Sequence, residues 1–428
     1  MSVLYSREDL GKGISLTKIY DKKFKNNCVK IVFVTPLGQK TACVNAMLMT
    51  LLVTSNRIVP SRTALTTKLT GLYGSSIGTN CGTIGDYQTI GLSASFIGDD
   101  YTIDGEEIST QVVGQLLNCL FDPDLADGEF KPKYFDIRKQ ELLDAIAAMV
   151  NDKRGYAIVQ AKKLIFEGEP AAVSTIGTTE LAESITQADL LAQYQKLIES
   201  AKIEITIVGG GNTQAVEKMI KDKLSAITRK DYISSVEYRH NSPAKPQVKT
   251  KELPMQVNQS KMVMAFKSDY EDIYVAKLFC MLLGATPFSK LFTNVREKLS
   301  LCYYCAAAYA DRKGTMMIDS GVEAANIEKA QKAILEQLEA LCNGDFTDDE
   351  LANTKKYLCG GFKSNYDSIY DIMGWYAAQN TRGTAFTPEE INQRVMTITR
   401  EQIIECAKSF KLDTIFVIRA KAKEGSDE

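Results

Sequence analysis

Two stretches that share one pattern decide the fold of this chain: VKIVFVT at residues 29–35 and KMVMAF at residues 261–266. Both are apolar runs of strand length, which is typical of buried strands. Each is followed by a stretch that is apolar nearly all round, ACVNAMLMTLLV at 42–53 and IYVAKLFCMLL at 273–283, which predicts a buried helix. A strand and a buried helix therefore occur twice in the same order.

Further segments recur in both halves. Residues 88–96 alternate apolar and polar side chains as a half-buried strand does, and residues 315–322 are their counterpart. Later, ITQADLL at 185–191 resembles ITREQII at 398–404. Each threonine predicts a helix N-cap, with a side chain three positions on that completes a capping box. We therefore expect an internal duplication, in which one structural unit occurs twice along the chain.

The duplication predicts an α+β fold of two homologous halves. Each half is expected to be a mainly antiparallel sheet covered by helices, because the helices are too few for regular βαβ alternation. The first half is expected at residues 1–228 and the second at 256–428. Residues 229–255 hold three prolines and many polar residues, which indicates a linker. Two halves joined in this way predict a clamshell-like molecule.

The composition is that of a globular protein and excludes several classes. The 428 residues are 45% hydrophobic and 24% charged, with 53 acidic and 51 basic side chains. A net charge of −2 gives no basic field for nucleic acid. No apolar run reaches the roughly eighteen residues of a membrane span. The first residues, MSVLYSREDLGKG, carry charges where a signal peptide needs an apolar segment, so a cytoplasmic protein is expected.

Cysteine and histidine restrict the chemistry further. Ten cysteines in a chain without an export signal are expected to be reduced and to act as small buried apolar residues. His240 is the only histidine in the sequence, and it falls in the predicted linker. Zinc motifs such as His-X-X-Glu-His need two histidines, so they cannot occur within this chain.

Three segments carry a resemblance to a known family. Residues 288–303 read FSKLFTNVREKLSLCY, residues 344–351 read GDFTDDEL, and residues 386–391 read FTPEEI. These segments resemble the pitrilysin, insulinase and mitochondrial processing peptidase family of zinc metallopeptidases, in its short bacterial form of two homologous halves. The resemblance covers nearly the whole chain and implies the fold of those peptidases.

The chain departs from this family at the metal site. Where the family carries an inverted zinc motif on the first buried helix, residues 45–50 read NAMLMT and offer no zinc ligand. The family's downstream glutamate falls near Asp144, with Glu141 one turn earlier. One carboxylate cannot hold a catalytic zinc, which needs three protein ligands. We therefore expect no metal or cofactor in this chain, and zinc in a catalytic partner.

The resemblance thus implies the non-catalytic subunit of a heterodimeric zinc metallopeptidase. Its partner would be a homologous catalytic subunit with an intact inverted zinc motif, and its substrate a peptide or protein. The chain is most similar to the inactive subunit that is associated, in Gram-positive bacteria, with aminopentanol modification of elongation factor P. The alternative is a structural or peptide-binding scaffold with no role in proteolysis. No activity is expected from the chain alone.

Arg296 and Tyr303 are the expected catalytic contribution to the partner's site. In the resembled family, the half opposite the zinc supplies an Arg/Tyr pair that stabilises the oxyanion formed when metal-bound water attacks a carbonyl. A surface arginine and a core tyrosine are the structural alternative. Tyr304 competes with Tyr303 for the role, because neighbouring strand residues face opposite ways, and is expected to contact substrate.

Tyr73 and Gly74 are expected to bind substrate as well. The corresponding region of the family contributes a strand beside the peptide-binding cleft, which would permit strand addition by an extended substrate. A tight turn between two elements is an equally good interpretation of the glycine-rich GLYG at residues 71–74.

Two other motifs are expected to carry no chemistry. Cys302 and Cys305 lie three apart on a predicted strand and should face opposite sides, so they should not form a metal or redox pair. The glycines at residues 209–211 lack the Lys-Ser/Thr of a phosphate-binding loop and are expected to form a flexible exit from a strand.

Overall fold

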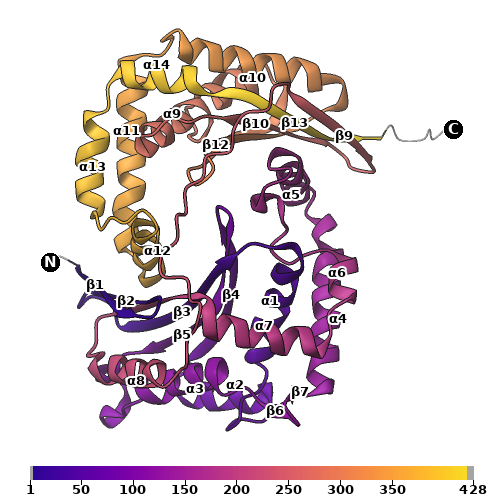
Figure 1. Ribbon diagram of the computed structural model, residues 1–428. Coiled ribbons are helices and arrows are strands. Elements are labelled where there is room, and N and C mark those ends of the chain that lie inside the picture. Colours follow the sequence, from indigo (N-terminus) through magenta and orange to yellow (C-terminus); the bar gives the residue numbers. More distant parts are fainter. Residues whose placement is uncertain (1–2, 422–428) are drawn as a thin grey trace. The chain divides into compact units, whose positions relative to one another are not determined.

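The computed structural model describes residues 3–421, which form two compact units, each built on one β-sheet (Figure 1). Each unit takes most of its residues from one half of the sequence and a short segment from the other. The first unit consists of residues 3–147, 173–238 and 366–383, and the second of residues 148–172, 239–365 and 384–421.

The sheet of the first unit has the strand order β1-β2-β8-β3-β5-β4. Neighbouring strands are antiparallel except β2 and β8, which run parallel. The short strands β6 and β7 form a separate hairpin. The strands of this unit are β1 (Leu4–Gly11), β2 (Ile14–Tyr20), β3 (Asn26–Pro36), β4 (Ser76–Ile84), β5 (Tyr87–Ile97), β6 (Leu125–Ala126), β7 (Glu129–Phe130) and β8 (Lys202–Gly209).

Helices cover both faces of this sheet. α1 and α3 pack on β5, with α7 beside α1 and α8 beside α3, whereas α12 packs on β3 and β8. The helices of this unit are α1 (Gln39–Leu52), α2 (Arg62–Gly71), α3 (Ser109–Phe121), α4 (Pro132–Ala148), α6 (Thr179–Glu183), α7 (Gln187–Ser200), α8 (Gln214–Ser225) and α12 (Ile369–Asn380).

Alternation along β3 separates the two faces of the first sheet. Val29, Ile31 and Phe33 are buried in the core that includes α1. Lys30 and Val32 point to the opposite face, because successive side chains of a strand alternate. The predicted strand and the predicted buried helix are both confirmed, since α1 is buried from Ala42 to Met49.

The sheet of the second unit has the order β11-β12-β10-β13-β9, antiparallel except between β13 and β9. Its strands are β9 (Lys249–Met255), β10 (Ser260–Lys267), β11 (Cys302–Ala310), β12 (Thr315–Val322) and β13 (Lys411–Ala420). Its helices are α5 (Lys153–Ile165), α9 (Ile273–Gly284), a π-helix (Leu291–Lys298), α10 (Ile327–Cys342), α11 (Asp348–Lys363), α13 (Pro388–Thr397) and α14 (Arg400–Ser409). Short 3₁₀ turns of the chain lie at Asp99–Tyr101, Ile103–Gly105, Met149–Asn151, Pro170–Ala172, Ala324–Asn326 and Ser364–Tyr366.

The two sheets repeat one topology. Read from β4 to β2 and from β11 to β9, the strand orders correspond one to one, and the last pair is parallel in both. The capping boxes predicted at Thr186 and Thr399 are both present, with Asp189 and Gln402 bonding back to the N-cap backbone. The expected α+β fold, with mainly antiparallel sheets covered by helices, is confirmed.

Each sheet is also covered by a helix from the other half of the chain (Figure 1). α5, from the first half, packs on β10 and β13. There Ala157 and Ala161 lie in one buried cluster with Val263 and Phe416. α12, from the second half, packs in the same way on β3 and β8. Each compact unit therefore contains one helix from the other half of the chain. That residues 1–228 and 256–428 are the two repeated halves remains a prediction.

The segment predicted as a linker is bound to both units along its length. Its first residue, Arg229, donates to the carbonyl oxygens of Lys12 and Ile198 (both 2.9 Å) in the first unit. Residues 230–248 contain no helix or strand, and the segment then ends in β9, which pairs with β13. Within residues 3–421, no helix is long and apolar enough to cross a membrane.

Replacing Phe416 by alanine tests the packing of α5 on the second sheet. Phe416 is 2% exposed in the cluster with Ala161, so its loss should leave a cavity and lower the free energy of unfolding by about 3–5 kcal/mol. Urea unfolding followed by circular dichroism measures this change. Met396→Ala is the control, because Met396 on α13 is 52% exposed and should change stability by less than about 0.5 kcal/mol. Equal effects of the two substitutions would contradict this packing.

Candidate functional site

Asn45 lies in α1, the buried helix on which the resemblance places the family's zinc motif. Its buried amide donates from Nδ2 to Gln88 Oε1 (2.7 Å) and accepts at Oδ1 from Gln193 Nε2 (2.9 Å). Gln88 Nε2 in turn donates to the carbonyl oxygens of Ala42 and Thr175 (both 3.1 Å). A satisfied network of neutral amides therefore occupies this position, and amides are not among the Cys, His, Asp and Glu side chains that bind zinc in proteins.

The two carboxylates that the resemblance places near the family's metal site make other contacts. Asp144 on α4 is exposed and accepts a hydrogen bond from Gln140 Nε2 (2.8 Å). Glu141 pairs with the buried Arg138, whose Nε also donates to Thr54 Oγ1 (2.9 Å). In the part of the chain that the structure describes, no group of three or more His, Cys, Asp or Glu side chains could hold a metal ion.

Arg296 lies on the π-helix that precedes β11. The widened turn is seen in the bond from Leu299 N to the carbonyl oxygen of Asn294 (3.0 Å), five residues earlier. The guanidinium group of Arg296 stacks on the Phe292 ring, 4.7 Å from its centroid, and pairs with Glu297 (3.4 Å). π-Helical turns are rare and occur often at functional sites. The Arg296 side chain is 40% exposed.

Tyr303 lies on a β-bulge at the start of β11. Cys302 pairs with Val322 and Tyr304 pairs with Gly321, so that Tyr303 is an extra residue in the ladder. The bulge directs the Tyr303 side chain outward, where it is 63% exposed.

The Tyr303 hydroxyl donates a hydrogen bond to Glu323 Oε1 (3.0 Å). This bond to a carboxylate raises the pKa of the Tyr303 phenol above its usual value. The phenol therefore keeps its proton at neutral pH and can serve as a hydrogen-bond donor.

The bulge also overturns the expectation that Cys302 and Cys305 face opposite sides. Both side chains are buried, 8% and 6% exposed, because the inserted residue brings them to the same face. Their hydrogen bond lowers the pKa of the Cys302 thiol and raises that of Cys305. All ten cysteines, these two included, are free thiols in the structure.

Tyr303 lines an open cleft with the start of α5 and the turn between β9 and β10. Arg154 of α5 stacks on the Tyr304 ring, 4.4 Å from its centroid, and binds Asp319 (Nη2 to Oδ1, 3.2 Å). Burial raises the pKa of Tyr304 to about 12. Arg296 is absent from the residues that line this cleft. The cations that line this cleft and lie over the Tyr304 ring are Arg154 and Lys261 (5.4 Å), which the sequence analysis did not single out.

Tyr73 and Gly74 form the turn that leads into β4. Both have left-handed backbone angles, with φ of 55° and 71°. The Tyr73 side chain is 37% exposed, and its hydroxyl accepts a hydrogen bond from Ile103 N (2.8 Å). β4 lies at the edge of the first sheet, and its outer side has no strand partner within residues 3–421.

The glycines at residues 209–211 form the exit from β8, and two of them pack closely against other backbone. A Cβ atom on Gly209 would lie 1.7 Å from Asn27 Oδ1, and one on Gly210 would lie 2.2 Å from the carbonyl oxygen of Phe24. Asp21 N also donates to the Gly209 carbonyl (3.1 Å). These glycines permit close packing of the backbone against the turn between β2 and β3.

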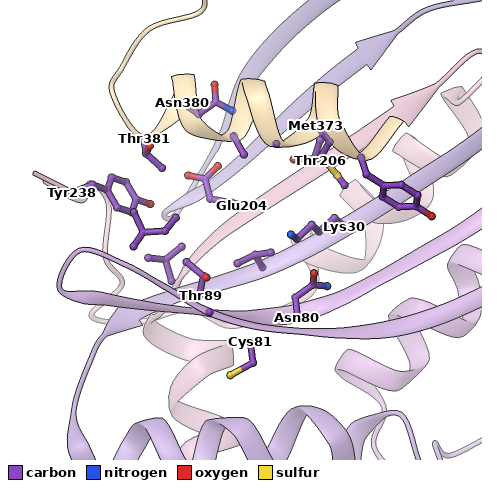
Figure 2. A pocket seen from close by; sticks show the side chains of 17 residues that line it. Lys30, Asn80, Cys81, Thr89, Glu204, Thr206, Tyr238, Met373, Asn380 and Thr381 are labelled. Atoms are coloured by element: carbon purple, nitrogen blue, oxygen red, sulfur yellow. The ribbon is translucent and has the colours of Figure 1, made fainter. Parts of the chain in front are cut away.

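A cavity in the first unit was not predicted from the sequence. It lies between the outer face of the sheet and α12, encloses about 300 Å³, and contains the side chain of Lys30 (Figure 2). The signal in the sequence was the lysine that interrupts the apolar run at residues 29–35. The run does not show what covers that face, because α12 comes from the far end of the chain.

Comparisons with known proteins agree with the resemblance. Residues 184–358 match the family model described as the peptidase M16 inactive domain. The chain is 26% identical over 420 residues to the probable inactive metalloprotease YmfF of Bacillus subtilis, covering 97% of each chain.

Solved structures share the fold over nearly the whole chain. A conserved protein from Enterococcus faecalis has a TM-score of 0.89 at 26% identity, covering 98% of this chain and 100% of that one. A protease from Helicobacter pylori has a TM-score of 0.80 at 15% identity, covering 97% and 99%. A peptidase M16 inactive domain from Pseudomonas fluorescens has a TM-score of 0.79 at 17% identity, covering 98% and 99%. Residues 184–358 are thus similar to the peptidase M16 inactive domain, and nearly the whole chain is similar to a probable inactive metalloprotease and shares the fold of these solved structures.

Proposed function

We propose that this chain is the non-catalytic subunit of a heterodimeric zinc metallopeptidase. The observation that carries the proposal is the contrast between two positions. The buried amide network of Asn45 stands where zinc ligands would be needed. Tyr303 instead presents a protonated phenol to solvent on a β-bulge, and Arg296 lies on the helix that leads to that strand.

Arg296 and Tyr303 would act on the partner's reaction by stabilising negative charge. A water bound to the partner's zinc would attack the peptide carbonyl and form a tetrahedral oxyanion, and a positioned cation and phenol hydroxyl would stabilise that charge. The Arg296 to Glu297 pair is solvent-exposed and contributes less than about 1 kcal/mol, so the guanidinium group can turn toward a bound substrate.

Tyr73, Gly74 and Tyr304 are proposed to bind the peptide. The left-handed turn at Tyr73 and Gly74 positions the start of β4, whose open edge supports the addition of an extended substrate strand. The Tyr304 ring stacks on the Arg154 guanidinium group, and Arg154 lines the same cleft as Tyr303. The halves 1–228 and 256–428 would then correspond to the two peptidase-like halves of the family.

The proposed partner is a homologous subunit with the intact inverted zinc motif, and the proposed location of the complex is the cytoplasm. The resemblance to the subunit associated with aminopentanol modification of elongation factor P makes that modification the first process in which to seek a substrate.

Arg296→Ala and Tyr303→Phe test the proposed catalytic role in the purified complex. Each substitution removes one group that stabilises the oxyanion, so each should lower kcat for peptide cleavage by about 10²–10³-fold and leave KM nearly unchanged. Lys298→Ala is the control, because Lys298 is an exposed cation on the same helix. Gel filtration checks that every variant still forms the complex. Wild-type turnover by Arg296→Ala would refute the assigned role.

Metal content tests the assignment of zinc to the partner. The purified complex should contain about one zinc ion per heterodimer, because only the partner would supply the three protein ligands. The isolated chain should contain almost none by elemental analysis and should not cleave peptides. Stoichiometric zinc in the isolated chain, or cleavage by it above background, would overturn the proposal. A complex that forms and cleaves no peptide would instead favour a scaffold role.

A further inference from the structure

The cavity between the first sheet and α12 has two walls of different character. One wall is the sheet face that carries Lys30, Val32 and Thr206, and the other is the α12 surface around Met373 and Ala377 (Figure 2). The exposed surface of the lining is mainly apolar, although more than half of the lining residues carry a polar group. Its volume of about 300 Å³ lies at the lower end of the roughly 300–1,000 Å³ that is typical of small-molecule sites.

Lys30 is the cation in this cavity without a protein anion. The described residues give its ammonium group no ion pair and no hydrogen bond, and burial lowers its pKa. Thr206 on β8 and Ser93 on β5 flank it in the sheet, since they are its register partners on the two sides. Lys30 is partly buried, and a partly desolvated ammonium group without a partner is unfavourable, so an anion that entered the cavity would gain an ion pair with it.

The acidic side chain of the cavity is already neutralised. The two carboxylate oxygens of Glu204 accept from the Arg7 guanidinium at 2.8 and 3.0 Å. Lys202 lies 3.5 Å from the same carboxylate. The charges around the cavity therefore sum to positive when Lys30 is included, which favours an anion.

The α12 wall is fixed at both ends and left open in the middle. Near its start the Tyr370 hydroxyl donates to Ser95 Oγ (2.9 Å). At its end Asn380 accepts from the Tyr5 hydroxyl (2.6 Å) and donates to Thr17 Oγ1 (3.0 Å). Between these anchors lies Gly374, where a Cβ atom would meet nothing within 4 Å. Glycine is unfavourable inside a helix, and here its effect is to leave space beside the sheet.

We propose that this cavity binds a small organic carboxylate. The carboxylate would pair with the Lys30 ammonium group and accept a hydrogen bond from Thr206 or from the second N–H of Asn80, whose first is donated to Ser93 (3.2 Å). The apolar part of the ligand would lie along Val32 and Met373. This proposal concerns the first unit alone and does not rest on the peptidase function.

Isothermal titration of the full chain with 4-methylpentanoate tests the proposal. The carboxylate should bind saturably, and the neutral 4-methylpentanamide at least about tenfold more weakly, because it cannot form the ion pair. The dipeptide Gly-Leu forms a second arm, since a free acid and the C-terminal carboxylate of a short peptide share the same chemistry. Tighter binding of one of these two probes identifies the source.

Three variants connect the binding to the cavity. Lys30→Met should weaken carboxylate binding at least about tenfold, whereas Lys68→Met, at an exposed lysine on α2, should leave it unchanged. Gly374→Leu should fill the cavity and abolish binding of the carboxylate and the amide alike.

Thermal unfolding provides a second readout. The carboxylate should raise the Tm of the wild-type chain and of Lys68→Met, and should not raise that of Lys30→Met or Gly374→Leu. The Tm of each variant without ligand shows that it is folded. No saturable binding of either carboxylate, equal binding of carboxylate and amide, or unchanged binding by Lys30→Met would overturn the proposal.

Discussion

The arrangement of the second unit depends on one buried ammonium group, that of Lys267 on β10. It is 3% exposed and donates to the carbonyl oxygens of Ile165, at the end of α5, and Pro243 (3.0 and 3.1 Å). The Asp413 carboxylate on β13 lies 3.5 Å away and also binds Lys245 (2.8 Å). A cation near helix-terminal carbonyls is favourable, and losing one partner of a buried pair costs about 3–5 kcal/mol. This cluster fixes a helix from the first half of the sequence on the second sheet.

Local structure could be predicted from the sequence where the residues that determine a strand or a helix end lie within that one segment. The apolar runs at residues 29–35 and 261–266 form strands, and Thr186 and Thr399 cap helices as expected. The exchange of α5 and α12 could not be read in this way. An apolar helix face predicts that something covers it, but it does not name the sheet, because that choice depends on contacts such as Lys267 with Ile165.

In the candidate site, too, some features follow from residue types in one segment, and others depend on contacts between distant segments. The lack of zinc ligands at residues 45–50 follows directly from residue types, whereas the amide network of Asn45 needed Gln88 and Gln193 to be brought from distant segments. The orientation of Tyr303 depends on a bulge, and one inserted residue leaves no mark in the run CYYCAAAY. Lys30 could be recognised in its predicted strand, but the α12 side chains that lie opposite it could not be predicted from that strand.

The reciprocal exchange of helices also constrains how this chain could be divided. A break within residues 230–248 would separate α5 from the sheet that it covers, and α12 from its sheet as well. Each fragment would expose the sheet face that the missing helix covers, and would carry the helix that packs on the other sheet. A gene fission at this point would therefore produce two polypeptides that must fold together, even though each contains all the described strands of one sheet.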